Sequence, residues 1–137
     1  TLIISRMRSK ISLKEPMASR KGRNMGIKRP KRVYISGKIT GLSEKEWTEN
    51  FEAAEKALTD AGYRVINPAK VKVDLDYQEY LTIDIILLGR CDAIYLLDNW
   101  QDSNGAKVER ATAEALNLTV IDISNREIYL KKVCEKE

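Results

Sequence analysis

The sequence contains no histidine, and this absence narrows the chemistry that is open to the protein. A Ser-His-Asp triad, a Cys-His nucleophile pair and the common histidine-based zinc sites are all excluded. Any catalysis must therefore use carboxylates, Tyr, Lys, Ser or backbone dipoles. The two cysteines, Cys91 and Cys134, are too few and too far apart in sequence for a disulfide framework or a zinc site. We expect no metal and no cofactor.

Long apolar runs are also missing. No segment approaches the roughly 18 consecutive apolar residues of a transmembrane helix, and the apolar stretch TLII at residues 1–4 is too short for a secretory signal. We therefore expect a cytoplasmic protein that does not span a membrane.

Positive charge is concentrated at the start of the chain. Residues 1–32 hold eleven Lys or Arg and one acid, a net charge of +10, whereas residues 33–137 hold thirteen Lys or Arg and nineteen acids, a net charge of −6. Residues 1–31 have no sustained apolar period, so we predict a basic, disordered leader before a domain at 32–137. This leader is either an arm that binds nucleic acid or a membrane surface, or an unstructured segment. The acidic domain argues against nucleic acid as the partner.

Strand-like and helix-like segments alternate from residue 32 onward. Short β-branched and aromatic runs predict strands at 32–36, 63–67, 91–98 and 119–123. Apolar patterning predicts helices at 44–61, 77–90 and 106–116, and we expect a terminal helix at 125–137. The alternation indicates a three-layer Rossmann-like or flavodoxin-like α/β domain with a parallel sheet of four to five strands. Ligands of such sheets bind at the carboxyl ends of the strands.

The loop after the first strand is one candidate binding segment. Gly37 and Gly41 enclose Lys38, Ile39 and Thr40. A lysine and a hydroxyl beside backbone N–H groups suit an anionic ligand. A turn with a solvated lysine is the simpler alternative.

The loop after the third strand is the second candidate. Ser103, Asn104 and Gly105 stand at the start of the helix predicted there, and Glu109 follows one turn later on its alanine-rich side. An acid on the packed face of a helix needs a reason, whereas an acid on a solvated face, paired with a neighbouring basic residue, does not.

Asp84 raises the same question, because apolar residues surround it in the helix predicted at 77–90. Burial raises the pKa of a lone carboxyl, which suits a general acid; a position at the polar rim of the helix is the alternative. Two acids near one sheet edge, without histidine, suggest chemistry at a glycosidic bond. One carboxylate would attack the anomeric carbon and the other would handle the proton of the leaving group.

Three motifs in this order and spacing resemble the nucleoside 2-deoxyribosyltransferase-like superfamily, which includes the 2′-deoxynucleoside 5′-phosphate N-hydrolases. They are YISG at 34–37, DIILLGRCD at 84–92 and SNGAKVE at 103–109. The resemblance covers roughly residues 32–121 and is greatest to a small, poorly characterised branch of the superfamily.

The resemblance implies a role for each matched residue. Glu109 corresponds to the nucleophile that attacks C1′ of deoxyribose, Asp84 to the acid that handles the proton of the departing base, and Tyr34 to the tyrosine that orients the glutamate. Ser103 corresponds to a phosphate-binding serine of the nucleotide hydrolases, where the transferases carry aspartate. The substrate-binding residues implied are Gly37, Lys38, Ile39, Thr40, Gly41, Trp100, Ser103, Asn104 and Gly105.

Some positions depart from the family pattern or belong to one branch of it. Lys38 stands where the transferases commonly carry proline. Trp100 either stacks on a base or is an ordinary rim aromatic. The larger base-binding insertions are missing from this sequence, so the resemblance does not identify the base.

The function expected is hydrolysis of a 2′-deoxynucleoside 5′-monophosphate, so the expected partner is a small-molecule nucleotide or nucleoside. A nucleoside 2-deoxyribosyltransferase and a non-catalytic binder of a nucleotide metabolite are the alternatives. Because family members complete the site from a neighbouring subunit, the resemblance also implies a homo-oligomer, a dimer or larger, with a shared site.

Overall fold

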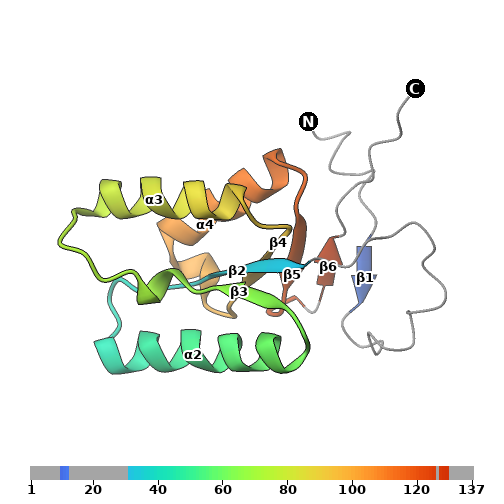
Figure 1. Cartoon of the computed structure of the whole chain (residues 1–137), viewed down its shortest axis with the longest axis horizontal. Coiled ribbons are helices and arrows are strands. Elements are labelled where there is room, and N and C mark those ends of the chain that lie inside the picture. Colours follow the sequence, from blue (N-terminus) through green and yellow to red (C-terminus); the bar gives the residue numbers. More distant parts are fainter. Residues whose placement is uncertain (1–9, 13–30, 126, 130–137) are drawn as a thin grey trace.

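One mixed β-sheet forms the centre of the fold (Figure 1). The computed structural model describes residues 10–12, 31–125 and 127–129. In these residues the strands lie in the order β1-β6-β5-β4-β2-β3. Their bounds are β1 Lys10–Ser12, β2 Arg32–Ser36, β3 Arg64–Ile66, β4 Ala93–Leu96, β5 Thr119–Asp122 and β6 Glu127–Tyr129. The helices are α2 Glu44–Asp60, α3 Tyr77–Gly89 and α4 Asn104–Ala115, with short 3-10 helices η2 Pro68–Lys70 and η3 Trp100–Asp102.

The neighbouring strands β3, β2, β4 and β5 are parallel. Helix α2 lies on one side of the sheet, and α3 and α4 lie on the other (Figure 1). The predicted three-layer α/β class with a parallel sheet of four to five strands is therefore confirmed. The predicted strands and the first three predicted helices agree with the observed ones to within about two residues at each end.

Successive residues of β2 point to opposite faces of the sheet, and each face has its own hydrophobic core. Val33 and Ile35 are fully buried on the side of the sheet where Phe51 of α2 packs. Tyr34, also fully buried, belongs to the core on the other side, together with Leu88 of α3. Each fully buried side chain of this size contributes about 1.5 to 3 kcal/mol relative to an exposed one.

The C-terminal segment differs from the prediction. Residues 127–129 form strand β6, which pairs antiparallel with β5, so the predicted helix at 125–137 is wrong there. Asp122 reverses the chain by accepting hydrogen bonds from Ser124 Oγ at 2.6 Å and from the backbone N of Asn125 at 3.3 Å. A bond such as the one between the Asp122 side chain and the Asn125 backbone favours a turn over a helix. Residues 130–137 lie outside the described part of the chain.

The structure also differs from the prediction within the basic leader at 1–31. Lys10–Ser12 form β1, which pairs antiparallel with β6 at the edge of the sheet, where we predicted disorder. Residues 1–9 and 13–30 lie outside the described part. Among the described residues, no helix combines the length and the apolar character that a membrane crossing requires.

Strand order brings two loops together at the carboxyl ends of β2 and β4. The chain leaves β2 toward α2 on one face and leaves β4 toward α4 on the other, so the strand order reverses between these two strands. Gly37, just after β2, packs so closely on the loop after β4 that an added Cβ would lie 2.5 Å from Leu97 Cδ1. A ligand crevice is expected at this point of the sheet.

Candidate active site

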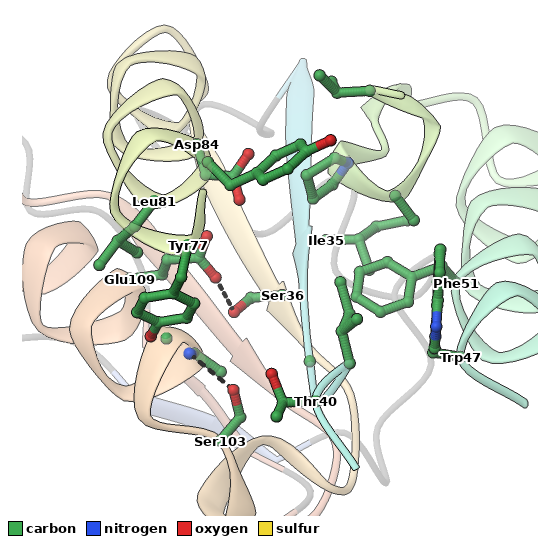
Figure 2. Close-up of a pocket in the computed structure, with 18 of the residues that line it drawn as sticks. Ile35, Ser36, Thr40, Trp47, Phe51, Tyr77, Leu81, Asp84, Ser103 and Glu109 are labelled. Atoms are coloured by element: carbon green, nitrogen blue, oxygen red, sulfur yellow. Dashed lines mark hydrogen bonds between the residues drawn. The ribbon is translucent and has the colours of Figure 1, made fainter. Parts of the chain in front are cut away.

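A cavity of about 530 Å³ opens at the carboxyl ends of these strands. Its walls come from the end of β2 and the following loop, from α2, from residues 68–73, from α3 and from the start of α4. Figure 2 shows Trp47 and Phe51 of α2 on one side, and Tyr77 and Asp84 of α3 on the other. The volume lies within the range of small-molecule sites, which is about 300 to 1,000 Å³.

Glu109 lies in the wall of this cavity and is only 6% exposed. It stands in the second turn of α4, on the side that also buries Ala106 and Ala113. The expectation that this acid lies on the packed face of the helix is therefore confirmed. A carboxylate in this setting needs hydrogen-bond donors, because burial removes its water.

Two hydroxyl groups of β2 supply those donors. Tyr34 donates its hydroxyl hydrogen to Glu109 Oε2 at 2.5 Å, and Ser36 donates to Glu109 Oε1 at 2.6 Å. Residues two apart on a strand face the same side, so β2 presents both hydroxyls to α4. The expected hydrogen bond between Tyr34 and the glutamate is present. Sequence reasoning missed Ser36, although its spacing of two from Tyr34 was a usable signal.

Burial is the main cause of the shifted pKa values of Glu109 and Tyr34. Burial raises the pKa of Glu109 above its ordinary value, although the hydrogen bonds from Ser36 and Tyr34 partly oppose the rise. Burial, and next the charge of Glu109, raise the pKa of Tyr34 far above its usual range. Tyr34 therefore keeps its proton and remains a hydrogen-bond donor at any physiological pH.

Asp84 lines the same cavity from α3 and is half-buried. Burial, followed by the charge of Glu109, raises its pKa from 3.8 to about 7. Among the described residues, its buried Oδ1 atom has no hydrogen-bond partner. A carboxyl that titrates near neutral pH and has a free oxygen in a cavity is suited to proton transfer.

The loop after β2 contributes only part of its predicted set. Gly37, Ile39 and Thr40 line the cavity. Lys38 and Gly41 are not among the lining residues. The backbone N of Lys38 donates to Asn99 Oδ1 at 3.0 Å, and Gly41 adopts a φ of 90°, which favours glycine.

The start of α4 forms one end of the cavity. Ser103 caps the helix, because its Oγ accepts a hydrogen bond from Ala106 N at 3.1 Å, and its own hydroxyl hydrogen stays available for a ligand. Gly105 also lines the cavity, and a Cβ there would lie 3.3 Å from the Tyr77 hydroxyl. Asn104 is exposed and is not among the lining residues.

Trp100 is buried in the core and does not line the cavity. Its Nε1 donates to Ser124 Oγ at 3.3 Å, and the guanidinium of Arg110 lies 4.7 Å from the centre of its ring. Arg110 also pairs with buried Asp122 at 3.5 Å. The geometry therefore gives Trp100 a packing role and does not support stacking on a base.

The cavity has a different set of aromatic residues, which sequence reasoning did not assign to a site. They are Trp47, Phe51, Tyr77 and Tyr80. Trp47 and Phe51 fit the apolar side of α2, so the pattern alone could not separate a cavity wall from ordinary core. Within the described residues, no three His, Cys, Asp or Glu side chains gather in a way that could hold a metal ion.

Comparison with known proteins identifies the family. Residues 31–122 match the family described as "Domain of unknown function (DUF4406)", and the chain belongs to this family. A search of curated proteins found no match. Among solved structures, the chain is similar to the CMP N-glycosidase BcmB of Clostridium botulinum, with 17% sequence identity and a TM-score of 0.46. That match covers 66% of each chain, so this chain spans about two thirds of the length of that structure.

Proposed function

We propose that this member of the DUF4406 family is an N-glycosidase that hydrolyses the bond between base and sugar in a 2′-deoxynucleoside 5′-monophosphate. The observation that carries the proposal is the arrangement of two carboxyl groups in one cavity. Glu109 is buried and held by hydroxyl donors on both oxygens, and Asp84 has a pKa of about 7. Paired carboxyls with different environments are typical of glycosidic-bond chemistry.

In the first step, a carboxylate oxygen of Glu109 attacks C1′ as the bond from C1′ to the base nitrogen breaks. The electron pair of that bond moves to the base, and protonated Asp84 gives its proton to the departing base. In the second step, Asp84 takes a proton from a water molecule, whose oxygen displaces Glu109 from C1′. The products are the free base and deoxyribose 5-phosphate, and both side chains return to their starting states.

The phosphate would bind at the start of α4. Backbone N–H groups and the positive end of the helix dipole favour an anion there. Ser103 offers its hydroxyl hydrogen, and Thr40 offers a second hydroxyl from the facing loop. Lys72, which also lines the cavity, adds a positive charge at its exposed rim.

The base would bind against the aromatic wall. Trp47 and Phe51 present large apolar surfaces to the cavity, and Tyr77 faces them from α3. Flat aromatic groups pack well against a purine or pyrimidine ring. This position leaves Asp84, on the same side as Tyr77, available to the departing nitrogen.

Release of free base from a panel of deoxynucleoside 5′-monophosphates, measured by chromatography, tests the function. Glu109→Gln should abolish release, because the amide is a poor nucleophile. Glu52→Gln is the matched control, since Glu52 is exposed on α2 and does not line the cavity. No release by the wild type, or undiminished release by the Glu109 variant, would refute the proposal. A new nucleoside formed on adding a second free base would identify a transferase, and ligand recovered intact would identify a binder.

We further infer that the protein forms a homo-oligomer. Helix α3 is apolar on most of its sides, and Ile86 on its outer side is 63% exposed. A helix with this distribution is typically covered on all faces. A second copy packed on α3 would lie close to the cavity, because Tyr77 and Asp84 belong to the same helix.

A further inference from the structure

The connection between β3 and α3 forms one wall of the cavity. Its lining residues are Pro68, Ala69, Val71, Lys72 and Val73. This connection runs from the edge strand of the sheet to α3, which lies on the side of the sheet opposite to α2 (Figure 1). A ligand held between the α2 side and the α3 side of the cavity would therefore contact it.

The first half of the connection is fixed to α2 through a carboxylate. Glu55 of α2 accepts hydrogen bonds from Asn67 Nδ2 at 3.0 Å and from Lys70 Nζ at 2.9 Å. These bonds hold the pKa of Glu55 below its ordinary value, so the carboxylate stays charged. Asn67 also caps the short helix η2, because its Oδ1 accepts a hydrogen bond from Ala69 N at 3.0 Å. Hydrogen bonds that involve a charged group are roughly twice as strong as neutral ones.

The second half of the connection is attached to α3 by one tyrosine. Tyr80 donates its hydroxyl hydrogen to Val73 O, and the same hydroxyl accepts a hydrogen bond from Val73 N at 3.1 Å. Within the described part of the chain, these are the hydrogen bonds that residues 72–75 make. The following residue, Asp76, caps α3. Because both partners are neutral and Val73 is 54% exposed, this attachment is weaker than the one at Glu55.

We propose that Tyr80 is a positioning residue that holds residues 72–75 against α3, and that the cavity opens to a ligand when Val73 separates from its hydroxyl. The inference goes beyond the proposed function, and only the ligand chosen for its last test rests on that function. Val73 can move outward without opening a buried core, because it is exposed. Lys72 would move with it, so opening would also withdraw a positive charge from the rim of the cavity.

Tyr80 is suited to affect binding more than a reaction. It stands four residues before Asp84 on α3, so both side chains lie on the face of the helix that lines the cavity. Its hydroxyl hydrogen is used by Val73 O, so in the closed arrangement Tyr80 has no proton to offer a ligand. Loss of this hydroxyl should therefore weaken the binding of a ligand and leave the chemical step nearly unchanged.

Amide hydrogen exchange of the full chain, followed by NMR, tests the attachment without any ligand. In the wild type, the Val73 amide should exchange about 100-fold faster or more than the amide of Ile35 in β2, because the segment opens without unfolding of the sheet. Tyr80→Phe keeps the ring and removes the hydroxyl, so the Val73 amide should exchange about fivefold faster still. The Lys70 amide, which donates to Asn67 O at 3.1 Å, should keep its rate.

Tyr77→Phe is the matched control for these exchange rates. It removes a hydroxyl from the same helix and the same cavity wall, but residues 72–75 bond to Tyr80 and not to Tyr77. The Val73 rate should therefore stay at its wild-type value. An unchanged Val73 rate in Tyr80→Phe, or an equal rise at Val73, Lys70 and Ile35, would overturn the role of Tyr80. A wild-type Val73 amide as slow as Ile35, or as fast as in an unstructured peptide, would overturn it too.

A deoxynucleoside 5′-monophosphate tests the opening. At saturation, verified by calorimetry, it should slow the Val73 exchange of the wild type about threefold or more, because the closed segment contacts the ligand. In the base-release assay, Tyr80→Phe should raise KM about threefold or more and keep kcat within about twofold. A bound nucleotide that leaves the Val73 rate unchanged, or a variant that loses kcat at an unchanged KM, contradicts the inference.

The proposed function can fail separately from this inference. If no nucleotide binds and no base is released, the hydrolase proposal is refuted. The exchange rates of the free protein then still decide whether Tyr80 holds the segment and whether the segment opens independently of the sheet.

Discussion

Replacing Asp84 with asparagine should make the protein more stable at alkaline pH while impairing the proposed activity. Burial and the charge of Glu109 raise the pKa of Asp84 from 3.8 to about 7. A carboxyl with a raised pKa binds its proton more tightly in the folded chain than in the unfolded chain. Its stabilising contribution is therefore complete below about pH 4 and is lost as the pH rises through about 7.

The size of the effect follows from the two pKa values. The difference between 3.8 and about 7 corresponds to about 4 kcal/mol of unfolding free energy. Asp84 is only half-buried, so solvent screening reduces this figure, and we expect about 2 kcal/mol. Asparagine has nearly the same shape and does not ionise. Asp84→Asn should therefore be about 2 kcal/mol more stable than the wild type at pH 8, and almost equal to it near pH 4.

Urea unfolding at pH 4, 6 and 8, followed by circular dichroism, measures this difference. Asp102→Asn is the matched control for the loss of one carboxyl group, because Asp102 is exposed and outside the cavity. Under the proposed function, the same Asp84 variant should lose about 10²-fold or more in base release, since the proposed general acid is gone. An Asp84 variant that is less stable than the wild type at pH 8, or equally stabilised at pH 4 and pH 8, would refute the electrostatic reasoning.

Two further substitutions test the packing and the assembly. Gly37→Ala should lower the unfolding free energy by about 1 to 3 kcal/mol, because the new Cβ would meet the Leu97 side chain; an unchanged urea midpoint would contradict this. Ile86→Lys should reduce the oligomer to monomers in light scattering, because a charge would enter the outer side of α3. A wild type that is already monomeric, or a variant that keeps its mass, would contradict the inferred assembly.

The sequence was enough to predict the parallel core of the fold, because each element there carries its own pattern. The apolar spacing of α2 and the β-branched run of β2 are local signals that survive in the folded chain. β1 and β6 have only three residues each, and no glycine or proline within two residues marks their ends, whereas Gly62 and Pro68 bound the equally short β3. Residues 127–129 form a strand because Asp122 makes the turn before them and because Ile121 of β5 pairs with Ile128. Both Asp122 and Ile121 lie outside residues 127–129.

The residues of the candidate site also differ in how far the sequence alone could predict them. Glu109 and Asp84 stand out in sequence because a charge in an apolar pattern is a local anomaly. Ser36 stands out less, because a serine before a glycine is an ordinary end of a strand and only its spacing of two from Tyr34 marks it. Its importance comes from α4, which brings Glu109 to it across 73 residues of chain. Trp100 was a candidate binding residue because a tryptophan in a loop suggests contact with a ligand. In the structure, Arg110 and Ser124 hold it in the core.

The contacts of Arg110 restrict the movement of Glu109, the residue that precedes it. Arg110 is joined to Glu114 at 2.9 Å, to Asp122 at 3.5 Å and to the ring of Trp100, while Glu109 points to the cavity side of the same helix. Any rotation of α4 that withdrew the Glu109 carboxylate would break the contacts of Arg110 with Asp122 and Trp100, which lie outside this helix. The entropy of fixing Glu109, the proposed nucleophile, is therefore lost when the chain folds, and a ligand would meet a carboxylate that is already held in place.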